Sequence, residues 1–324
     1  MLAVQVVDYG RPWDVVRTVE ASEPPSPPAG QLKVKLLASP IHPADLLLMR
    51  GLYGKRPPLP TGMGGEGVAS VVDTGAGTDF KRGDRVIIPY GHDTWADYLT
   101  ISANRAVKVP AGIDDAQASM ALINPFTARL MLTDFVDLAP GEFVIQNAAN
   151  SGVGRAVIAI ARARGLRTVN VVRRPELIDE LKAAGGDVVL VDGPDLPKRV
   201  AEATGKAPIR LGFEGVASEA MRSLTGTVAE GGTLVVYAGM SGQPAVAFPP
   251  HLIFRDLTLR GFWLIKWFRS ADPKLVADIL NEVLPLIADG SIKVPVEHSY
   301  PLSSPREAIS HAARAKGKIL FTAS

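Results

Sequence analysis

The stretch from residue 142 to residue 164 constrains the fold of this chain more than any other part. It opens with the mainly apolar run 142–147, which predicts a β-strand. A turn at 149–154 follows, and residues 152–164 then carry apolar side chains at helical spacing. A strand, a short turn and a helix in this order predict the first βα unit of a parallel sheet.

The alternation continues through the second half of the chain. Further strands are predicted at 168–172, 187–191, 209–213, 233–237 and 257–262, with helices at 175–184 and near 195–204. Strands that alternate with helices predict a parallel sheet with right-handed crossovers, here a doubly wound Rossmann sheet. A long helix at 272–289 and a last strand at 318–322 end the chain.

The first 110 residues have a different pattern. Short β-rich runs at 32–37, 67–73 and 85–89 are separated by glycine and proline, which predicts a small β-barrel or sandwich. The prolines at 24–28 are interpreted as a turn, since no change of composition follows them. A chain of 324 residues is long enough for two such domains.

The composition of the chain excludes several classes of function and binding site. A net charge of +2 argues against a large basic surface for nucleic acid, and the absence of cysteine excludes disulfides and thiolate metal sites. No apolar run reaches the roughly 18 residues of a membrane span, and the start of the chain lacks the features of a signal or transit peptide. We therefore expect a cytoplasmic protein without a membrane partner.

The turn at 149–154 stands where a dinucleotide fold carries G-x-G-x-x-G. Ala149 and Ser151 replace the first two glycines, and Gly154 fills the third position. The N–H groups of the following helix would receive a diphosphate, and Ser151 would add a hydroxyl donor. A glycine-containing turn without a ligand is the alternative, but the array of strands and helices around it favours cofactor binding.

The end of the second strand of this array indicates which dinucleotide binds. About 20 residues beyond the turn, NAD-specific folds carry an acidic residue for the ribose hydroxyls. This chain has Arg173 and Arg174 there, and guanidinium groups hold a 2′-phosphate by charge-assisted hydrogen bonds. A solvated basic loop is the alternative; the position favours NADPH.

Several segments together carry a family resemblance. They are 41–45, 51–53, 124–128, 146–154, 171–173, 237–241 and 260–263. With them the chain resembles the medium-chain dehydrogenase/reductase superfamily, and within it the zinc-independent 2-enoyl thioester reductases of bacterial and mitochondrial type. The resemblance implies an α/β protein with a GroES-like β-barrel domain at 1–121, a Rossmann NADPH-binding domain at 122–264 and a C-terminal return at 265–324. It also implies a homodimer that pairs strands near the aromatic-rich residues Trp263, Trp267 and Phe268, a segment that could instead line an acyl channel.

The resemblance also assigns site residues. Tyr53 would donate the proton, although a tyrosine in such a turn could simply pack on the surface. The residues implied to contact the cofactor are Asn124, Thr127, Asn150, Ser151, Gly152, Val153, Gly154, Arg173, Arg174, Tyr237, Ala238, Gly239, Met240, Phe262, Trp263, Leu264 and Lys318. Core packing for Phe262 and Trp263 and a solvated surface for Lys318 are the alternatives, and Arg174 is displaced from the family's usual Arg-Asp-Arg pattern.

No metal site is expected. The first zinc position of metal-dependent relatives corresponds to His42, but where they carry Gly-His-Glu this chain reads Gly64-Gly65-Glu66. A catalytic zinc ion normally has three protein ligands, and the five histidines show no ligand spacing. Reduction of a polarised C=C bond avoids the need for a metal to stabilise an alkoxide.

The expected reaction is NADPH-dependent reduction of a 2-enoyl thioester carried by coenzyme A or by acyl carrier protein. Two alternatives stay open. One is a zinc-independent NADPH:quinone oxidoreductase of the same superfamily. The other is a non-catalytic NADPH-binding protein with a sensory role.

Overall fold

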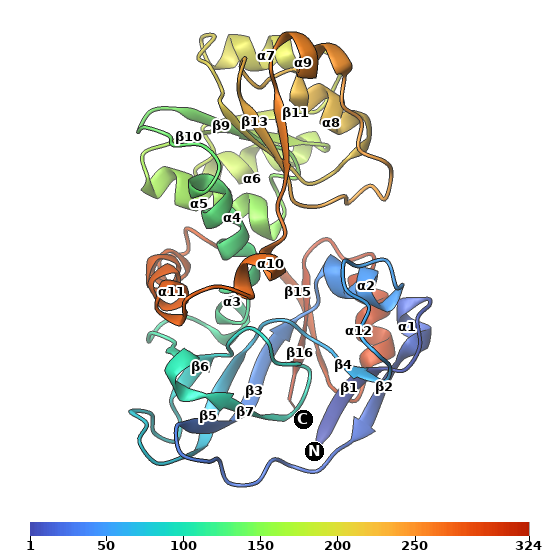
Figure 1. The fold of residues 1–324 in the computed structure, drawn as a ribbon, viewed down its shortest axis with the longest axis vertical. Helices are drawn as coiled ribbons and strands as arrows, with labels where there is room; N and C mark the ends of the chain where they lie inside the picture. The colour runs from blue at the N-terminus through green and yellow to red at the C-terminus, as the bar shows by residue number, and fades with distance from the viewer. Residues whose placement is uncertain (324) are drawn as a thin grey trace. The chain divides into compact units, whose positions relative to one another are not determined.

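The computed structural model describes residues 1–323, which form two compact units. Unit 1 contains Met1–Ile123, Ala271–Ala288 and the chain from Val294 onward. Unit 2 contains Asn124–Ser270 and Asp289–Lys293. The chain therefore leaves unit 1 after Ile123, returns to it at Ala271, and passes through unit 2 once more at Asp289–Lys293 before it ends in unit 1. Figure 1 follows this path by colour along the chain.

Unit 1 is built on β-sheets around the long strand β3 (Gln31–Pro40). The larger sheet has the order β15-β16-β3-β5-β6-β8, and β7 also pairs with β3. Its other strands are β5 (Val68–Thr74), β6 (Arg85–Ile87), β7 (Tyr98–Ser102), β8 (Val107–Lys108), β15 (Val296–Pro301) and β16 (Lys318–Thr322). A smaller sheet has the order β2-β1-β4, from β1 (Leu2–Val6), β2 (Val16–Glu20) and β4 (Thr61–Gly62).

The burial of β3 explains why its sequence forms a strand. Leu32, Val34 and Leu36 are buried, whereas the residues between them are half-buried. This period of two directs one face of the strand into the core. The C-terminal strand β16 adds to the same sheet, because Phe321 pairs antiparallel with Ser39. Figure 1 shows this last segment of the chain beside the N-terminal strands.

The helices of unit 1 are mostly short. They are α1 (Pro12–Val15), α2 (Pro43–Met49), α3 (Asp115–Ala118), α11 (Pro273–Ala288) and α12 (Pro305–Ala312), with a 3-10 turn at Ala103–Arg105. Only α11, predicted at 272–289, was expected from the sequence. The short α2 begins directly after His42, where Pro43 occupies the first helical position.

Unit 2 is a six-stranded parallel sheet in the order β11-β10-β9-β12-β13-β14. The strands are β9 (Phe143–Gln146), β10 (Arg167–Val172), β11 (Val188–Val191), β12 (Leu211–Glu214), β13 (Thr233–Val236) and β14 (Thr258–Gly261). Numbered within this sheet, the order is 3-2-1-4-5-6, that of the Rossmann fold. The order reverses between β9 and β12, and ligands of such sheets bind at that point.

The helices of unit 2 accompany the strands. They are α4 (Ile123–Thr133), α5 (Gly152–Ala163), α6 (Ile178–Ala183), α7 (Leu196–Ala203), α8 (Ser218–Thr225), α9 (Pro249–Phe254) and α10 (Leu264–Phe268), with a 3-10 turn at Pro175–Leu177. The predicted strands and helices of this half are confirmed with small shifts at their ends. The largest shifts are in α6, which was expected from residue 175 and follows a 3-10 turn there, and in β12, which was expected at 209–213. Helices α4, α8, α9 and α10 were not predicted.

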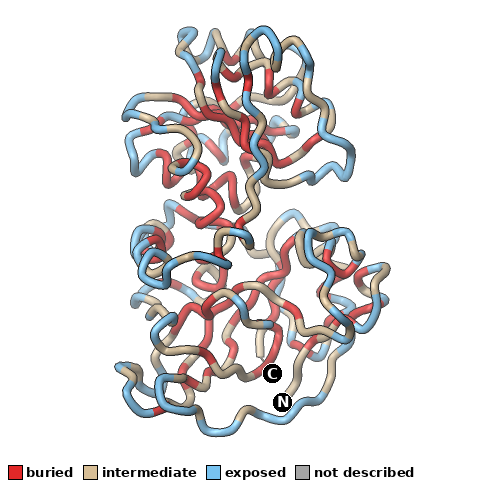
Figure 2. Tube along the Cα trace, viewed as in Figure 1, coloured by how far each residue is buried: buried red, intermediate tan, exposed pale blue. Residues whose placement is uncertain are grey.

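Figure 2 shows the buried residues following the strands and the helix faces against them. All four residues of β9 are buried, as expected for a central parallel strand covered on both faces. Within residues 1–323 no helix combines the length and apolar character needed to cross a membrane.

Candidate functional site

The turn between β9 and α5 has the geometry of a phosphate-binding loop. Ser151 is the N-cap of α5, and its Oγ accepts a hydrogen bond from the Gly154 N–H at 3.1 Å. This bond satisfies one of the first amides of the helix and leaves the hydroxyl hydrogen available. The other amides of the first turn, with the positive end of the helix dipole, suit an anion.

Two glycines are required here for steric reasons. A Cβ at residue 154 would lie 2.4 Å from the carbonyl oxygen of Ala149, so the helix can approach the turn only with glycine. A Cβ at residue 152 would lie 2.4 Å from Nδ2 of Asn124. The close contact that the motif demands is therefore present at both positions.

Four buried side-chain atoms of unit 2 lack a hydrogen-bond partner within residues 1–323: Nδ2 of Asn124, Oε1 of Gln146, Nε of Arg199 and the hydroxyl of Tyr237. Two of them lie near the phosphate turn: Nδ2 of Asn124 is beside Gly152, and the hydroxyl of Tyr237 is near Ser151 but outside hydrogen-bond geometry. Burial raises the pKa of Tyr237 to about 12, so this hydroxyl stays a donor at neutral pH. Buried donors without partners are uncommon in native proteins, and these two fit a ligand rich in acceptor oxygens, as a dinucleotide is.

The two arginines after β10 differ in their surroundings. Arg173 is exposed, and the structure gives its guanidinium no hydrogen bond or ion pair with residues 1–323. Arg174 is half-buried, and its Nε lies 3.6 Å from Oε1 of Glu176. Arg173 is therefore the guanidinium that can pair with an added anion without first losing an internal partner.

A carboxylate that the sequence analysis missed shapes the loop after β12. Nδ2 of Asn147 donates to Oε2 of Glu214 at 2.8 Å, and Oε1 of Glu214 accepts the N–H groups of Val216 and Ala217. Ala217 has a φ of 65°, a strained backbone for a residue other than glycine. Burial raises the pKa of Glu214. An acidic residue at the carboxyl end of a strand beside β9 was the signal that could have identified it.

The neighbouring loop, which follows β13, holds the predicted residues 237–240. The N–H of Met240 donates to the Gly215 carbonyl at 3.0 Å, which ties the loop after β13 to the loop after β12. Ala238 is half-buried, whereas Gly239 and Met240 are exposed. These two loops follow the neighbouring strands β12 and β13, at the carboxyl ends of the strands, where the phosphate turn also lies.

The remaining predicted cofactor residues of unit 2 lie around α4, α5 and α10. Thr127 and Leu264 are buried, Phe262 and Trp263 are half-buried, and the Trp263 ring lies 5.3 Å from the Arg269 guanidinium carbon. Val153 is buried in the first turn of α5, and the Asn150 carbonyl accepts from Nε of Arg155. Their contacts with a cofactor stay a prediction.

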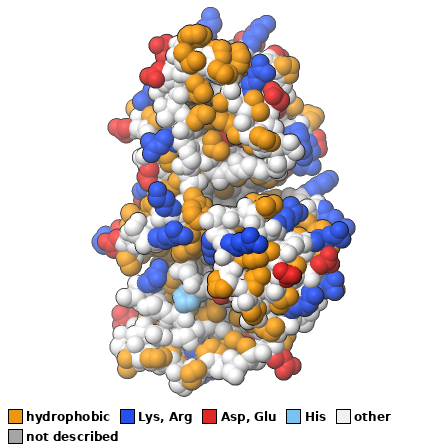
Figure 3. Space-filling view, turned by 45° about the vertical axis from the view of Figure 1, so that its right-hand side comes forward, with side chains coloured by type: hydrophobic (Ala, Val, Ile, Leu, Met, Phe, Trp, Pro, Cys, Tyr) orange, Lys and Arg blue, Asp and Glu red, His pale blue; other side chains and the backbone are white. Residues whose placement is uncertain are grey.

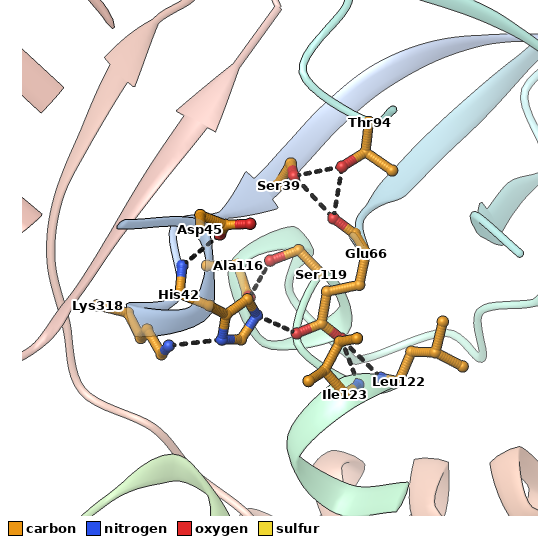
Figure 4. Close-up of polar contacts among 10 residues, drawn as sticks. All are labelled: Ser39, His42, Asp45, Glu66, Thr94, Ala116, Ser119, Leu122, Ile123 and Lys318. Atoms are coloured by element: carbon orange, nitrogen blue, oxygen red, sulfur yellow. Dashed lines mark hydrogen bonds and ion pairs between the residues drawn. The ribbon is translucent and has the colours of Figure 1, made fainter. Parts of the chain in front are cut away.

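In unit 1 a polar network surrounds the start of α2. Nε2 of His42 lies 2.6 Å from Oε1 of Glu66, and Nδ1 lies 3.0 Å from Nζ of Lys318. His42 and Glu66 are buried, and Lys318 is half-buried. Figure 4 shows the three side chains in a row, with His42 in the middle. The sequence analysis noted each residue but did not bring them together.

Tyr53 also belongs to unit 1. It lies in the loop that follows α2, is half-buried, and packs against the apolar core of the unit. Its neighbour Leu52 is 71% exposed, so the loop carries apolar surface on the outside. The role of Tyr53 as proton donor stays a prediction.

The residues around His42 do not fit a catalytic zinc ion. Both ring nitrogens of His42 already have partners, and Gly65 offers no side chain. Within residues 1–323 no group of three or more histidine and carboxylate side chains is arranged to hold a metal. A catalytic zinc ion normally needs three protein ligands, so we assign it no step.

Comparisons with known proteins agree with this geometry. Residues 28–111 match the family described as alcohol dehydrogenase GroES-like domain, and residues 152–282 match the family described as zinc-binding dehydrogenase. The human mitochondrial enoyl-acyl-carrier-protein reductase is 39% identical over 94% of this chain and 84% of its own length. The chain belongs to the enoyl reductase family of the medium-chain dehydrogenases/reductases. The corresponding Arabidopsis thaliana reductase is 36% identical over 91% of this chain and 80% of its own length.

Solved structures of related proteins have the same fold. An NADPH:quinone reductase from Bacillus thuringiensis superposes with a TM-score of 0.89 at 25% identity, covering 100% of this chain and 99% of its own. Etr1p in complex with NADP and crotonyl-CoA gives a TM-score of 0.87 at 24% identity over 99% of both chains. The predicted combination of a GroES-like barrel and a Rossmann domain is confirmed, and the chain is an oxidoreductase of this enoyl reductase family.

Proposed function

We propose that this enoyl reductase uses NADPH to reduce the C=C bond of a 2-enoyl thioester. The hydride adds to the β-carbon, and a proton adds to the α-carbon. The observation that carries the proposal is the 39% identity to an enoyl reductase over 94% of the chain. The phosphate turn and the unpaired Arg173 support it independently.

NADPH, when bound, supplies the hydride. The first turn of α5 and the hydroxyl of Ser151 bind its diphosphate, and Arg173 binds the extra phosphate. Asn124 Nδ2 and the Tyr237 hydroxyl donate to its oxygens, which would satisfy both buried donors. The charge-assisted bonds of Arg173 favour NADPH over NADH.

Tyr53 supplies the proton in this proposal. Hydride addition to the β-carbon leaves an enolate, whose oxygen needs a hydrogen-bond donor and whose α-carbon needs a proton. A phenol, whose reference pKa is near ~10, is protonated at neutral pH and can serve both purposes. Lys318 adds a cation that contacts the cofactor.

Quinone reduction is the second candidate function. The structure of the Bacillus thuringiensis quinone reductase superposes with a TM-score of 0.89, and a mycobacterial quinone oxidoreductase superposes with a TM-score of 0.83 at 27% identity. Both proposed reactions use NADPH, and neither includes a step at a metal ion. They differ in whether the proton goes to carbon or to a quinone oxygen.

We also propose that two copies pair through the edge of unit 2. Strand β14 is the edge of the six-stranded sheet, and the helix α9 before it exposes Ile253 at 69% and Phe254 at 77%. An unpaired strand next to exposed apolar side chains suits a second copy of the same edge. Figure 3 shows hydrophobic side chains gathered at the end of unit 2 where Figure 1 places α7 and α9.

The deciding experiment compares initial rates of NADPH oxidation with crotonyl-CoA, with longer enoyl-CoA chains, with an enoyl-acyl carrier protein and with a quinone. Enoyl reduction with a clear preference for NADPH over NADH is expected. Rapid quinone reduction without enoyl reduction would select the second candidate. NADPH binding with no turnover on any of these substrates would select a sensory role.

A further inference from the structure

The row Lys318–His42–Glu66 has a fixed end at Glu66. Its Oε2 accepts the N–H groups of Leu122 at 2.9 Å and Ile123 at 2.7 Å. Its backbone carbonyl accepts the hydroxyls of Ser39 and Thr94. Figure 4 shows the carboxylate held between these amides and His42. Glu66 is 0% exposed, so neither its position nor its orientation can change without breaking buried hydrogen bonds.

The fixed carboxylate determines the protonation pattern of the row. A carboxylate is only an acceptor, so Nε2 of His42 carries a hydrogen and donates it to Glu66. An ammonium is only a donor, so Nδ1 of His42 is the acceptor for Lys318. A neutral imidazole with its hydrogen on Nε2 meets both requirements at once. The ring is thereby fixed in one tautomer and one orientation.

The Lys318 ammonium has three hydrogens, and His42 takes one of them. Within residues 1–323 the structure gives Nζ no second hydrogen-bond partner. We propose that His42 and Glu66 are positioning residues for Lys318, which hold its ammonium so that the other two hydrogens are available to an oxygen of NADPH. This inference rests on the proposed function, in which Lys318 contacts the cofactor.

Burial and nearby carboxylates act in opposite directions on the pKa of the Lys318 ammonium. Burial lowers the pKa of Lys318, and the carboxylates of Glu66 and Asp45 oppose this shift. Asp45 lies at the same corner, where its Oδ2 accepts the His42 N–H at 2.7 Å. Burial raises the pKa of Asp45. Glu66, in contrast, is held by the N–H groups of Leu122 and Ile123. These are the charged groups that face the row.

The first test reads the tautomer of His42 from its imidazole nitrogen chemical shifts by NMR, with His42→Phe for assignment. The wild type should show a neutral ring protonated on Nε2. In Glu66→Gln the amide oxygen must face the two backbone N–H groups, so the amide NH₂ faces Nε2 of His42. The hydrogen should then move to Nδ1, where it opposes the Lys318 ammonium. A wild-type ring protonated on Nδ1, or on both nitrogens, would overturn the proposal.

The second test is a double-mutant cycle on NADPH affinity, measured by fluorescence titration of the whole protein. Lys318→Met and His42→Phe should each weaken binding by about 10-fold, the scale of a hydrogen bond to a charged group. The double variant should be no weaker than Lys318→Met alone, because His42 acts only through Lys318. Additive losses would mean that His42 acts through general structure and would contradict the inference. His298→Phe, an exposed histidine of the same unit, should bind like the wild type.

The two proposals fail in different ways. A wild type that binds NADPH and passes both tests, but does not reduce crotonyl-CoA, would overturn the proposed function and keep the positioning role. A wild type that reduces crotonyl-CoA with an additive cycle would overturn the positioning role alone. A wild type that does not bind NADPH would overturn both. Thermal unfolding of each variant is followed by circular dichroism. If His42→Phe does not fold, Glu66→Gln replaces it in the double-mutant cycle.

Discussion

The side-chain amide of Asn124 lies against the backbone of Gly152, where a Cβ at residue 152 would stand 2.4 Å from Nδ2. The same nitrogen is buried without a hydrogen-bond partner in residues 1–323. The contact that excludes a side chain at residue 152 is therefore also the contact that places an open donor beside the phosphate turn. Steric fit and ligand binding depend here on the same two residues.

Gly152→Ala should weaken NADPH binding by about 10-fold, because the methyl group displaces Asn124 and an overpacked methyl costs about 1–3 kcal/mol. Isothermal titration of NADPH into the variant measures the loss. Gly261→Ala is the matched control, since a Cβ there meets no atom within 4 Å. Equal affinity of Gly152→Ala and the wild type would show that Asn124 does not bind the cofactor.

Much of unit 2 could be predicted because its signals are local. The apolar run of β9 and the helical spacing of α5 are each contained in about a dozen consecutive residues. Arg173 could be found because it follows a strand at a fixed distance from the turn. The helices α8 and α9 were not predicted, although with eight and six residues they are as long as α7 and α6, which were.

The polar row of unit 1 could not be predicted from local signals. His42 and Glu66 are 24 positions apart, and Lys318 is 276 positions from His42. They meet because β16 pairs with β3, a long-range pairing that no periodicity reports. The loop at Ala217 was hidden for a different reason. A positive φ is rare for alanine, and here the Ala217 N–H donates to the buried Glu214 carboxylate.

Tyr53→Phe should lower kcat for crotonyl-CoA by about 10²–10⁴-fold, the usual contribution of a general acid. The NADPH dissociation constant should stay unchanged, because the hydroxyl is assigned to the proton and not to the cofactor. Stopped-flow turnover and NADPH titration on the same preparation separate the two effects. Tyr98→Phe, a tyrosine of β7, serves as control. If kcat survives in Tyr53→Phe, another group donates the proton.

Arg173→Ala should raise the dissociation constant of NADPH by about 10- to 100-fold, the scale of lost hydrogen bonds to a charged group. NADH affinity should hardly change, since NADH lacks the extra phosphate. Arg174→Ala should have a smaller effect, because Glu176 already lies near its guanidinium. The assignment would be refuted by an equal loss for NADPH and NADH.

Phe254→Asp should convert the proposed dimer into a monomer, because a charge would enter the centre of the proposed apolar contact. Light scattering after size-exclusion chromatography gives the mass of each form directly. Leu275→Asp introduces the same charge at another exposed apolar position and should leave the dimer intact. If the wild type is a monomer, the proposed dimer does not form. If Phe254→Asp is still a dimer, the interface lies elsewhere.

The stability of unit 2 should depend on pH through Glu142 and Arg210. Nε and Nη2 of Arg210 donate to the two carboxylate oxygens of Glu142, each at 2.8 Å. The hydrogen bonds from Arg210 lower the pKa of Glu142 from 4.5 to about 2. A carboxyl group with a lowered pKa stabilises the fold above its unfolded pKa and loses that contribution as pH falls through the folded pKa.

Glu142→Gln should therefore lower the urea midpoint at neutral pH, and its difference from the wild type should shrink between pH 4.5 and about 2. Urea unfolding followed by circular dichroism across this range measures the difference at each pH. Glu230→Gln removes an exposed carboxylate of the same unit, and its urea midpoint should differ from that of the wild type by the same amount at every pH. If the difference in urea midpoint between Glu142→Gln and the wild type stays constant down to the lowest pH, Glu142 contributes through packing and its charge plays no part.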